Sequence, residues 1–150
     1  MLGWISDIGD QIVSINISES NDSNKFYGNI SEKLIENNYP IITFKNNELI
    51  YSYQYIGCSF SGVHIIRTWS NEGGTGIFCN IILVTLSTDT IIEIYNHKSI
   101  KEERFIIKKV GTIPLGDRYE GNISYKFGFL LIDQCNNIHT TRKKSILLIL

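Results

Sequence analysis

Alanine is absent from this 150-residue chain, and no apolar run approaches the ~18 residues that a membrane-spanning helix needs. Alanine has the highest helix propensity, whereas isoleucine, which is abundant here, favours strands, so the composition indicates a β-rich protein. The first residues contain no basic region followed by an apolar stretch, which predicts that no signal peptide is present. We therefore expect a soluble, cytoplasmic protein without a membrane span.

The chain also lacks a charge excess and a cysteine framework. Its formal net charge is −1 and its isoelectric point about 6.3, whereas nucleic-acid-binding proteins normally have a basic surface. Cys58, Cys79 and Cys135 are odd in number and widely spaced, so they fit neither a disulfide framework nor a zinc-ligand set. Reduced thiols in a reducing compartment are expected, although one pair could bridge in an oxidising one. No cofactor, metal or nucleic-acid partner is expected.

The most prominent feature present is a glycine-rich turn followed by the most apolar run inside the chain, in residues 72–87. Gly73, Gly74 and Gly76 permit a sharp turn because glycine adopts positive φ at little cost. Residues 77–86 are rich in β-branched side chains and predict a central, buried strand. The rest of the chain is expected to cover that strand.

The overall pattern predicts one domain, residues 1–150, of the α+β class: a mostly antiparallel meander, sheet or barrel-like, with one or two short helices. The best helix candidate is residues 29–37, where Asn29 can cap the first turn and Glu32 stands in a capping-box relation to it. Further strands are expected at residues 11–18, 63–69, 90–95, 104–110, 118–126, 129–133 and 145–150. Non-strand segments are expected at residues 88–89 (a tight turn), 96–103 (a charged loop), 111–117 (a proline-containing bend) and 134–140 (a loop).

Residues 40–45 and 48–56 predict a hairpin, because the asparagines between them tolerate the backbone of a two-residue turn. In the second arm Tyr51, Tyr53 and Tyr55 alternate with other residues and therefore share one face of the sheet. That face is either an ordinary sheet surface or an exposed aromatic binding surface, since tyrosine is enriched in interfaces.

The second half of the chain carries two short motifs, Gly-Gly-Thr-Gly-Ile-Phe at residues 73–78 and Leu-Gly-Asp-Arg at residues 115–118. With the apolar strand between them, they resemble a pattern found in small bacterial lipoproteins and hypothetical proteins of unassigned function. The resemblance covers residues 57–150 and implies a shared fold. It supplies no catalytic residues, and members of that group are usually exported.

No catalytic signature is convincing. The turn at residues 72–76 lacks the lysine and following helix of a phosphate-binding loop, which favours a structural turn over a nucleotide site. His97 and His139 each precede a Ser or Thr by two residues, as in two-histidine phosphoesterases, but both lie in polar, loop-like surroundings, and His64 is isolated. Cys79 lies in an apolar setting typical of a buried structural thiol. We therefore expect that the chain is not an enzyme.

Several residues are of types that anchor interfaces. Arg67 and Trp69 are the clearest cases. Asp117 and Arg118 either lock a bend by charge-assisted hydrogen bonds or face a ligand, and Arg118 could instead meet Glu72 across the sheet. The predicted partner-contact residues are Tyr51, Tyr53, Tyr55, Arg67, Trp69, Glu72, Asp117 and Arg118.

These observations favour a soluble, non-catalytic binding protein. Its most concrete form is an immunity protein that binds and neutralises a cognate toxin, because the chain is small, lacks an active-site signature and carries an aromatic surface. One alternative is an envelope-associated β domain of the lipoprotein type. Another is a phage inhibitor that sequesters a small ligand or nucleotide.

Overall fold

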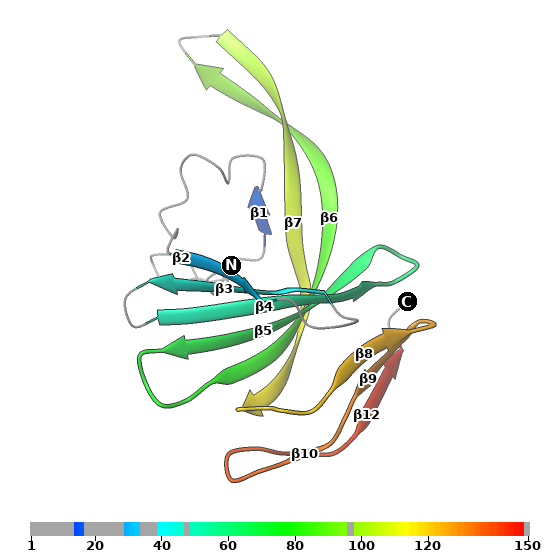
Figure 1. Cartoon of the computed structure of the whole chain (residues 1–150). Coiled ribbons are helices and arrows are strands. Elements are labelled where there is room, and N and C mark those ends of the chain that lie inside the picture. Colours follow the sequence, from blue (N-terminus) through cyan, green and yellow to red (C-terminus); the bar gives the residue numbers. More distant parts are fainter. Residues whose placement is uncertain (1–13, 17–28, 34–38, 47–48, 96–97, 149–150) are drawn as a thin grey trace.

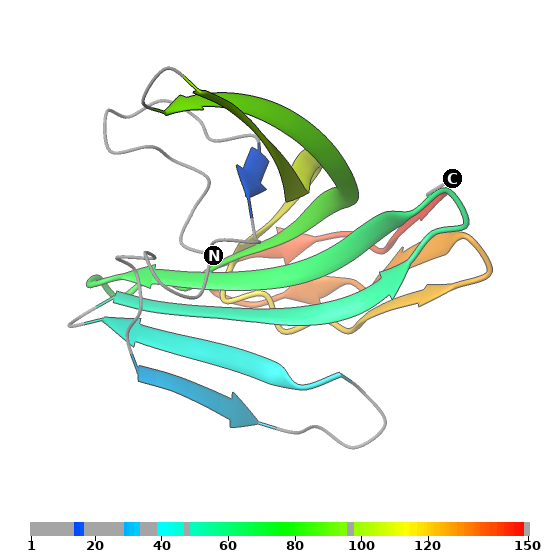
Figure 2. The same cartoon turned by 90° about the horizontal axis from the view of Figure 1, so that it is seen from above.

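The computed structural model describes residues 14–16, 29–33, 39–46, 49–95 and 98–148 (Figure 1). All twelve regular elements in these ranges are β-strands, arranged in three antiparallel sheets. The expected α+β class is therefore wrong: the described part is all-β and is built on a large curled sheet that resembles half a barrel (Figures 1 and 2). Within the same ranges, no helix is long and apolar enough to span a membrane.

The large sheet has seven strands in the order β1-β7-β6-β5-β4-β3-β2. Strands β2 to β7 form a simple meander in which neighbours in sequence are neighbours in space, and β1 pairs with β7 at the far edge. The bounds are β1 Ser14–Asn16, β2 Asn29–Lys33, β3 Ile41–Asn46, β4 Leu49–Cys58, β5 Val63–Glu72, β6 Phe78–Tyr95 and β7 Lys98–Asp117.

A smaller sheet packs against one face of the large one. It has the order β12-β9-β8, and a short ribbon, β10-β11, lies between β9 and β12 in the chain. The core between the two sheets contains fully buried aliphatic side chains such as Ile65, Ile81, Leu130 and Ile132. Burial of one such side chain is worth roughly 1.5–3 kcal/mol. The bounds are β8 Ile123–Lys126, β9 Phe129–Ile132, β10 Cys135–Asn136, β11 Thr141–Arg142 and β12 Ser145–Leu148.

The other face of the large sheet, here called the distal face, is apolar as well. Val84 and Ile107 are buried there and pack with Ile66 and Ile82. Because side chains alternate along a strand, Ile81 of β6 packs in the inter-sheet core, whereas Ile82 and Val84 pack on the distal face. Burial on two faces explains why residues 81–84 are apolar throughout rather than alternating.

Strands β6 and β7 extend far beyond the rest of the sheet (Figure 1). The pairing of β5 with β6 ends at Thr85, and that of β1 with β7 ends at Ile106. Beyond these points the two strands form eight further consecutive pairs, from Thr88 opposite Phe105 to Tyr95 opposite Lys98. This projecting ribbon, residues 86–95 and 98–105, is called the arm below.

The β7 strand contains two β-bulges. Leu83 pairs with Gly111 and Val84 with Lys109, which leaves Val110 as an extra residue. A second irregularity leaves Leu115 unopposed, and its side chain is buried in the inter-sheet core. Bulges of this kind bend a strand and increase its twist, so they contribute to the curl of the sheet.

The predicted helix at residues 29–37 is wrong over the part that the structure describes. Asn29–Lys33 is strand β2, which pairs with β3 so that Ile30 lies opposite Phe44, and residues 34–37 lie outside the described residues. A capping pattern of a few residues provides weak local preference, and the ladder with β3 overrides it.

The expected turn at residues 88–89 and bend at residues 111–117 are also wrong, because both segments are strand. Asp89, read as a turn residue, instead accepts two hydrogen bonds from Arg104 across the ladder, at 2.9 and 2.7 Å. The expected loop at residues 96–103 is strand from Lys98 onward, with residues 96–97 outside the described part, and Cys135–Asn136 in the loop expected at 134–140 is strand β10.

Other expectations agree with the structure. The hairpin is formed by β3 and β4, which pair from Ile41 opposite Gln54 to Asn46 opposite Leu49. The central strand is β6, although it runs nine residues beyond the predicted end at Leu86. The last predicted strand is present as β12, which docks beside β9, with residues 149–150 outside the described part.

Candidate functional site

The eight residues predicted to contact a partner lie on separate parts of the molecule rather than in one cluster. They form three groups. Tyr51, Tyr53 and Glu72 line a hollow of the distal face. Tyr55, Arg67 and Trp69 line the space between the two sheets, where Tyr55 also contacts His64. Asp117 and Arg118 lie at the end of β7.

Two tyrosines of the predicted row share the hollow on the distal face. Tyr51 and Tyr53 line it together with Phe44, Ile66 and Ile82 in a space of about 120 Å³. Burial raises the pKa of both phenols, and Glu72 raises that of Tyr51 further. Both hydroxyl groups are therefore protonated near neutral pH, and the hollow is an aromatic, hydrogen-bonding surface with Tyr53 40% exposed.

Tyr55 is engaged within the protein. Its hydroxyl lies 3.2 Å from Nδ1 of His64, and its ring meets that of Tyr39 edge-on at a centroid distance of 4.8 Å. Burial is the main cause that raises the pKa of Tyr55. The Sγ of Cys58 lies 3.9 Å from Nε2 of His64 on the other side of the imidazole. These contacts give Tyr55 a structural role.

Asp117 and Arg118 lock the bend at the end of β7. Arg118 Nη1 donates to Asp117 Oδ2 at 2.9 Å, and Asp117 Oδ1 accepts from the backbone N–H of Ile77 at 2.7 Å. The backbone N–H of Arg118 donates to the carbonyl of Ile77, also at 2.7 Å, and Arg118 Nη2 donates to the carbonyl of Thr75. The pair thus holds the glycine-rich turn against β7, and Arg118 takes Asp117 rather than Glu72 as its partner.

A turn of the C-terminal segment completes this corner. Thr140 Oγ1 donates to the carbonyl of Asp117, and Asn137 Nδ2 donates to the carbonyl of Arg118 at 3.0 Å. Gly116 has a φ of +106° and lies directly under the side chain of Thr140. The corner joins three segments: the glycine-rich turn, the end of β7 and the turn at residues 137–140.

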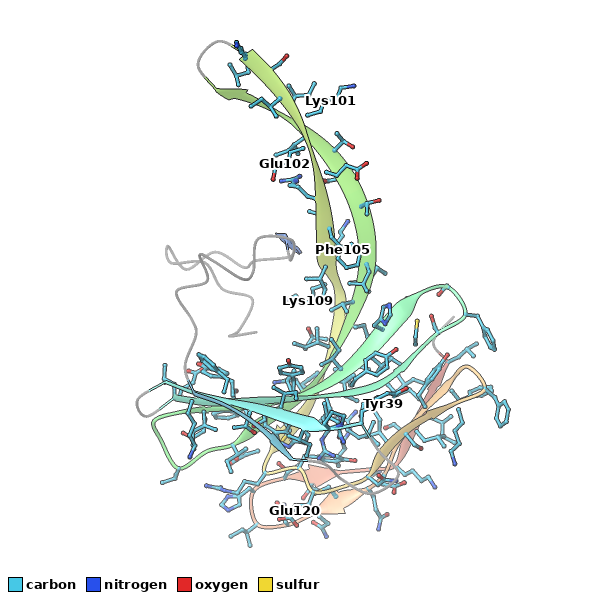
Figure 3. All side chains as sticks on the ribbon, turned by 45° about the horizontal axis from the view of Figure 1, so that its top comes forward. Tyr39, Lys101, Glu102, Phe105, Lys109 and Glu120 are labelled. Carbon is cyan, nitrogen blue, oxygen red and sulfur yellow. The ribbon has the colours of Figure 1, made fainter. Side chains whose placement is uncertain are left out.

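A second concave feature of the described residues is a groove between the sheets, here called the inter-sheet groove. It has a volume of about 720 Å³ and runs between β3–β5 on one side and residues 120–126 on the other. Figure 3 labels a residue on each side, Tyr39 just before β3 and Glu120 between β7 and β8. Gln54, Arg67, Trp69 and Tyr125 are among the side chains that line it.

Arg67 is the principal charged group of the inter-sheet groove. Its Nη2 donates to the carbonyl of Tyr119 at 2.9 Å, and its Cζ lies 4.6 Å from the ring centroid of Trp69 and 5.4 Å from that of Tyr119. Its Nε is buried without a hydrogen-bond partner, and no carboxylate of the described residues lies within ion-pair distance. Burial lowers the pKa of the guanidinium from its ordinary value. The site presents a partly desolvated cation.

Tyr119 and Gln54 are site residues that the sequence reasoning missed. Tyr119 is 2% exposed, and its hydroxyl donates to the carbonyl of Asp133 at 2.7 Å. Gln54 is 6% exposed and lies opposite Arg67 on the neighbouring strand, with Nε2 donating to the carbonyl of Tyr39 at 2.9 Å. For Gln54 a signal existed, because it alternates with the tyrosine row and therefore faces the opposite side of β4.

The remaining polar candidates are placed apart. His64 contacts Tyr55, while His139 Nδ1 lies 3.8 Å from Asp117 Oδ2, and His97 lies outside the described residues. Across the ranges that the structure describes, no three His, Cys, Asp or Glu residues are grouped so that they could hold a metal ion. Burial raises the pKa of the Cys79 thiol, as expected for a structural cysteine.

Comparison of the chain with protein-family models, with curated proteins and with solved structures finds no match. The resemblance to small bacterial lipoproteins therefore stays a prediction that rests on the motifs at residues 73–78 and 115–118. In the structure these motifs meet at the corner, where Asp117 and Arg118 hold Thr75 and Ile77. Their positions are explained by the local fold. The functional proposals that follow rest on the surfaces of the molecule itself.

Proposed function

We propose that the chain is a non-catalytic binding protein that recognises another protein through its arm and distal face. The arm supports this proposal most directly. Beyond Thr85, no described strand other than β7 pairs with β6, so the backbone N–H and C=O groups on the edge of β6 away from β7 point outward for up to ten residues. Unpaired strand edges are templates for strand addition by another chain.

The arm also carries apolar side chains that are exposed. Leu86, Ile92 and Ile94 are 40%, 64% and 80% exposed. They fall on even-numbered residues of β6 that continue the side of Val84, so they extend the distal face along the arm as a stripe that is apolar at both ends, with Thr88 and Thr90 between Leu86 and Ile92. A two-stranded ribbon alone is marginally stable in water, and exposed apolar patches generally mark interaction sites.

The partner chemistry follows from these two features. A partner that covers the arm must offer an extended segment to the edge of β6 and apolar side chains to the stripe. Binding of this kind takes affinity from backbone hydrogen bonds and specificity from alternate side chains. The hollow lined by Tyr51 and Tyr53 lies on the same face and offers hydroxyl groups for further contacts.

The concrete form of the proposal is an immunity protein that neutralises a cognate toxin by occluding its functional surface. This form rests on the sequence arguments of small size and an aromatic recognition surface. It is tested by co-expressing the chain with the product of an adjacent gene and measuring both growth rescue and affinity. A growth-inhibiting product that binds with a micromolar or lower Kd and is neutralised supports the proposal.

A matched pair of variants connects that result to the arm. Ile92→Ser removes an exposed side chain of the stripe, whereas Ile100→Ser removes one of similar exposure, 64% against 53%, from the opposite side of the ribbon. We expect Ile92→Ser to weaken binding roughly tenfold or more, as for a central interface residue, and Ile100→Ser to change it little. Equal effects of the two variants would contradict the proposal. So would a result in which Ile92→Ser weakens only the association of the chain with itself and leaves partner binding unchanged.

A further inference from the structure

A second binding feature lies away from the arm, in the inter-sheet groove. The Arg67 guanidinium is held between the rings of Trp69 and Tyr119, and its one described hydrogen bond goes to a backbone carbonyl. Buried charges in proteins are normally paired, because an unpaired one loses hydration without an opposing gain. Arg67 lacks that opposing charge among the described residues.

The surroundings of Arg67 suit a small ligand. The groove volume of about 720 Å³ lies in the range of roughly 300–1,000 Å³ that is typical of small-molecule sites. Trp69 and Tyr125 contribute aromatic surface to the lining, and Gln54, Asn122 and Ser124 contribute polar side chains. Arginine is the side chain best suited to hold a carboxylate or phosphate, because its planar N–H groups match the oxygens of both.

The charges of the groove also favour an anionic ligand. Its lining contains two cationic side chains, Arg67 and Lys126, and one anionic one, Glu120. Glu120 is exposed and forms no ion pair with Arg67. The groove therefore has a net positive charge, and its most desolvated charge is the guanidinium.

We propose that the inter-sheet groove binds a small organic anion, whose carboxylate or phosphate head group contacts Arg67 and whose flat apolar body lies against the aromatic side chains of the groove. This inference is independent of the arm. It assigns a site to the alternative function raised by the sequence, the binding of a small ligand, for which no residues had been predicted. The head group supplies the negative charge that the described residues do not place beside Arg67. The aromatic side chains favour an anion with a planar apolar body over an inorganic anion.

The test uses three probes of the same shape, benzoate, phenyl phosphate and neutral benzamide, added to the full chain. The reporter is the Nε–H resonance of Arg67 in nitrogen-15 NMR. This signal is observable because the Nε–H group is buried and therefore exchanges slowly with water. We expect benzoate, phenyl phosphate or both to shift this resonance in a saturable manner, and benzamide to leave it unmoved. The stronger of the two anions identifies the head-group class.

Two variants and a control locate the binding. Arg67→Lys keeps the charge but loses the planar fork, and Gln54→Glu places a carboxylate opposite Arg67 on the next strand, where it competes with the probe. Each should weaken anion binding roughly tenfold or more, the effect of one charge-assisted hydrogen bond. The control is Arg142→Lys, since Arg142 also has a buried, unpartnered Nε and donates to one carbonyl but does not line the groove.

Three results would overturn the inference. The first is that neither anion shifts the Arg67 signal at concentrations up to roughly 10 mM, which would saturate a millimolar site. The second is that benzamide binds as well as benzoate. The third is that Arg142→Lys, which keeps the charge, weakens binding as much as Gln54→Glu, because the effect would then be one of general stability. Since the wild-type titration and Gln54→Glu both leave Arg67 in place, the test does not depend on the folding of Arg67→Lys.

Discussion

Replacement of Gly116 by alanine tests whether the corner controls the stability of the two-sheet structure. Gly116 has a φ of +106°, and an added Cβ would lie 2.6 Å from Oγ1 and 2.8 Å from Cγ2 of Thr140. Backbone strain at such a φ costs about 1–3 kcal/mol. Overpacking against a side chain that is 8% exposed adds about 1–3 kcal/mol. We expect Gly116→Ala to lower the free energy of unfolding by about 2–6 kcal/mol.

Gly62 provides the matched control. It also has a positive φ, +82°, but an added Cβ would meet nothing within 4 Å. Gly62→Ala therefore carries backbone strain alone, partly offset by about 0.4–1 kcal/mol from the lower entropy of the unfolded chain. The difference between the two variants isolates the clash with Thr140 and should be about 1–3 kcal/mol.

Urea unfolding, followed by the fluorescence of the half-buried Trp69, measures these differences. With a slope of about 2 kcal/mol per molar urea, Gly116→Ala should lower the midpoint by roughly 1–3 M. Thr140→Ala removes the two closest atoms, so the double variant with Gly116→Ala should lose less stability than the sum of the single losses. The reasoning is refuted if Gly116→Ala costs no more than Gly62→Ala, or if the losses add.

Two further predictions concern reactive side chains. Cys58 is exposed while the other two cysteines are buried. One thiol per chain should therefore react rapidly with an aromatic disulfide reagent that releases a yellow thiolate, and Cys58→Ser should abolish this fast phase. Rapid reaction of two or more thiols would contradict the burial of Cys79 and Cys135. Tyr119→Phe removes the hydrogen bond to the Asp133 carbonyl and should cost about 1–2 kcal/mol at pH 7. Burial raises the pKa of Tyr119, so the folded state retains this proton when the unfolded state loses it; stability should fall as pH rises above about 10, and less steeply in Tyr119→Phe. Parallel pH curves for the two proteins would show that Tyr119 does not contribute.

Local sequence was sufficient where a strand pattern and its turn were adjacent in the chain. Alternation in β4 and the asparagines before it predicted the β3–β4 hairpin and placed the tyrosines on one face. Local pattern failed for β2 and for the arm. Asp89 belongs to a turn by residue type, and only its pairing with Arg104, 15 residues later, makes it a strand residue.

The site could not be predicted from spacing for a similar reason. Arg67 was selected as an interface type, yet its position in the structure is fixed by a hydrogen bond to the carbonyl of Tyr119, which is 52 residues away. For the pair Asp117–Arg118 the sequence left a bend lock and a ligand contact open, and only the hydrogen bonds to Thr75 and Ile77 in the folded chain show the first. The groove itself arises only when the small sheet packs on the large one.

The extra residue Val110 sets to which side the β7 half of the arm directs its side chains. Ile107 and Ile113 are both odd-numbered residues of β7, yet Ile107 packs on the distal face and Ile113 packs toward the inter-sheet core. The inversion occurs at the bulge, where β7 counts one residue more than β6. Deletion of Val110 would leave every side chain of the arm chemically intact but turn those of its β7 half to the opposite side, so the direction of these side chains depends on the length of the strand rather than on residue identity.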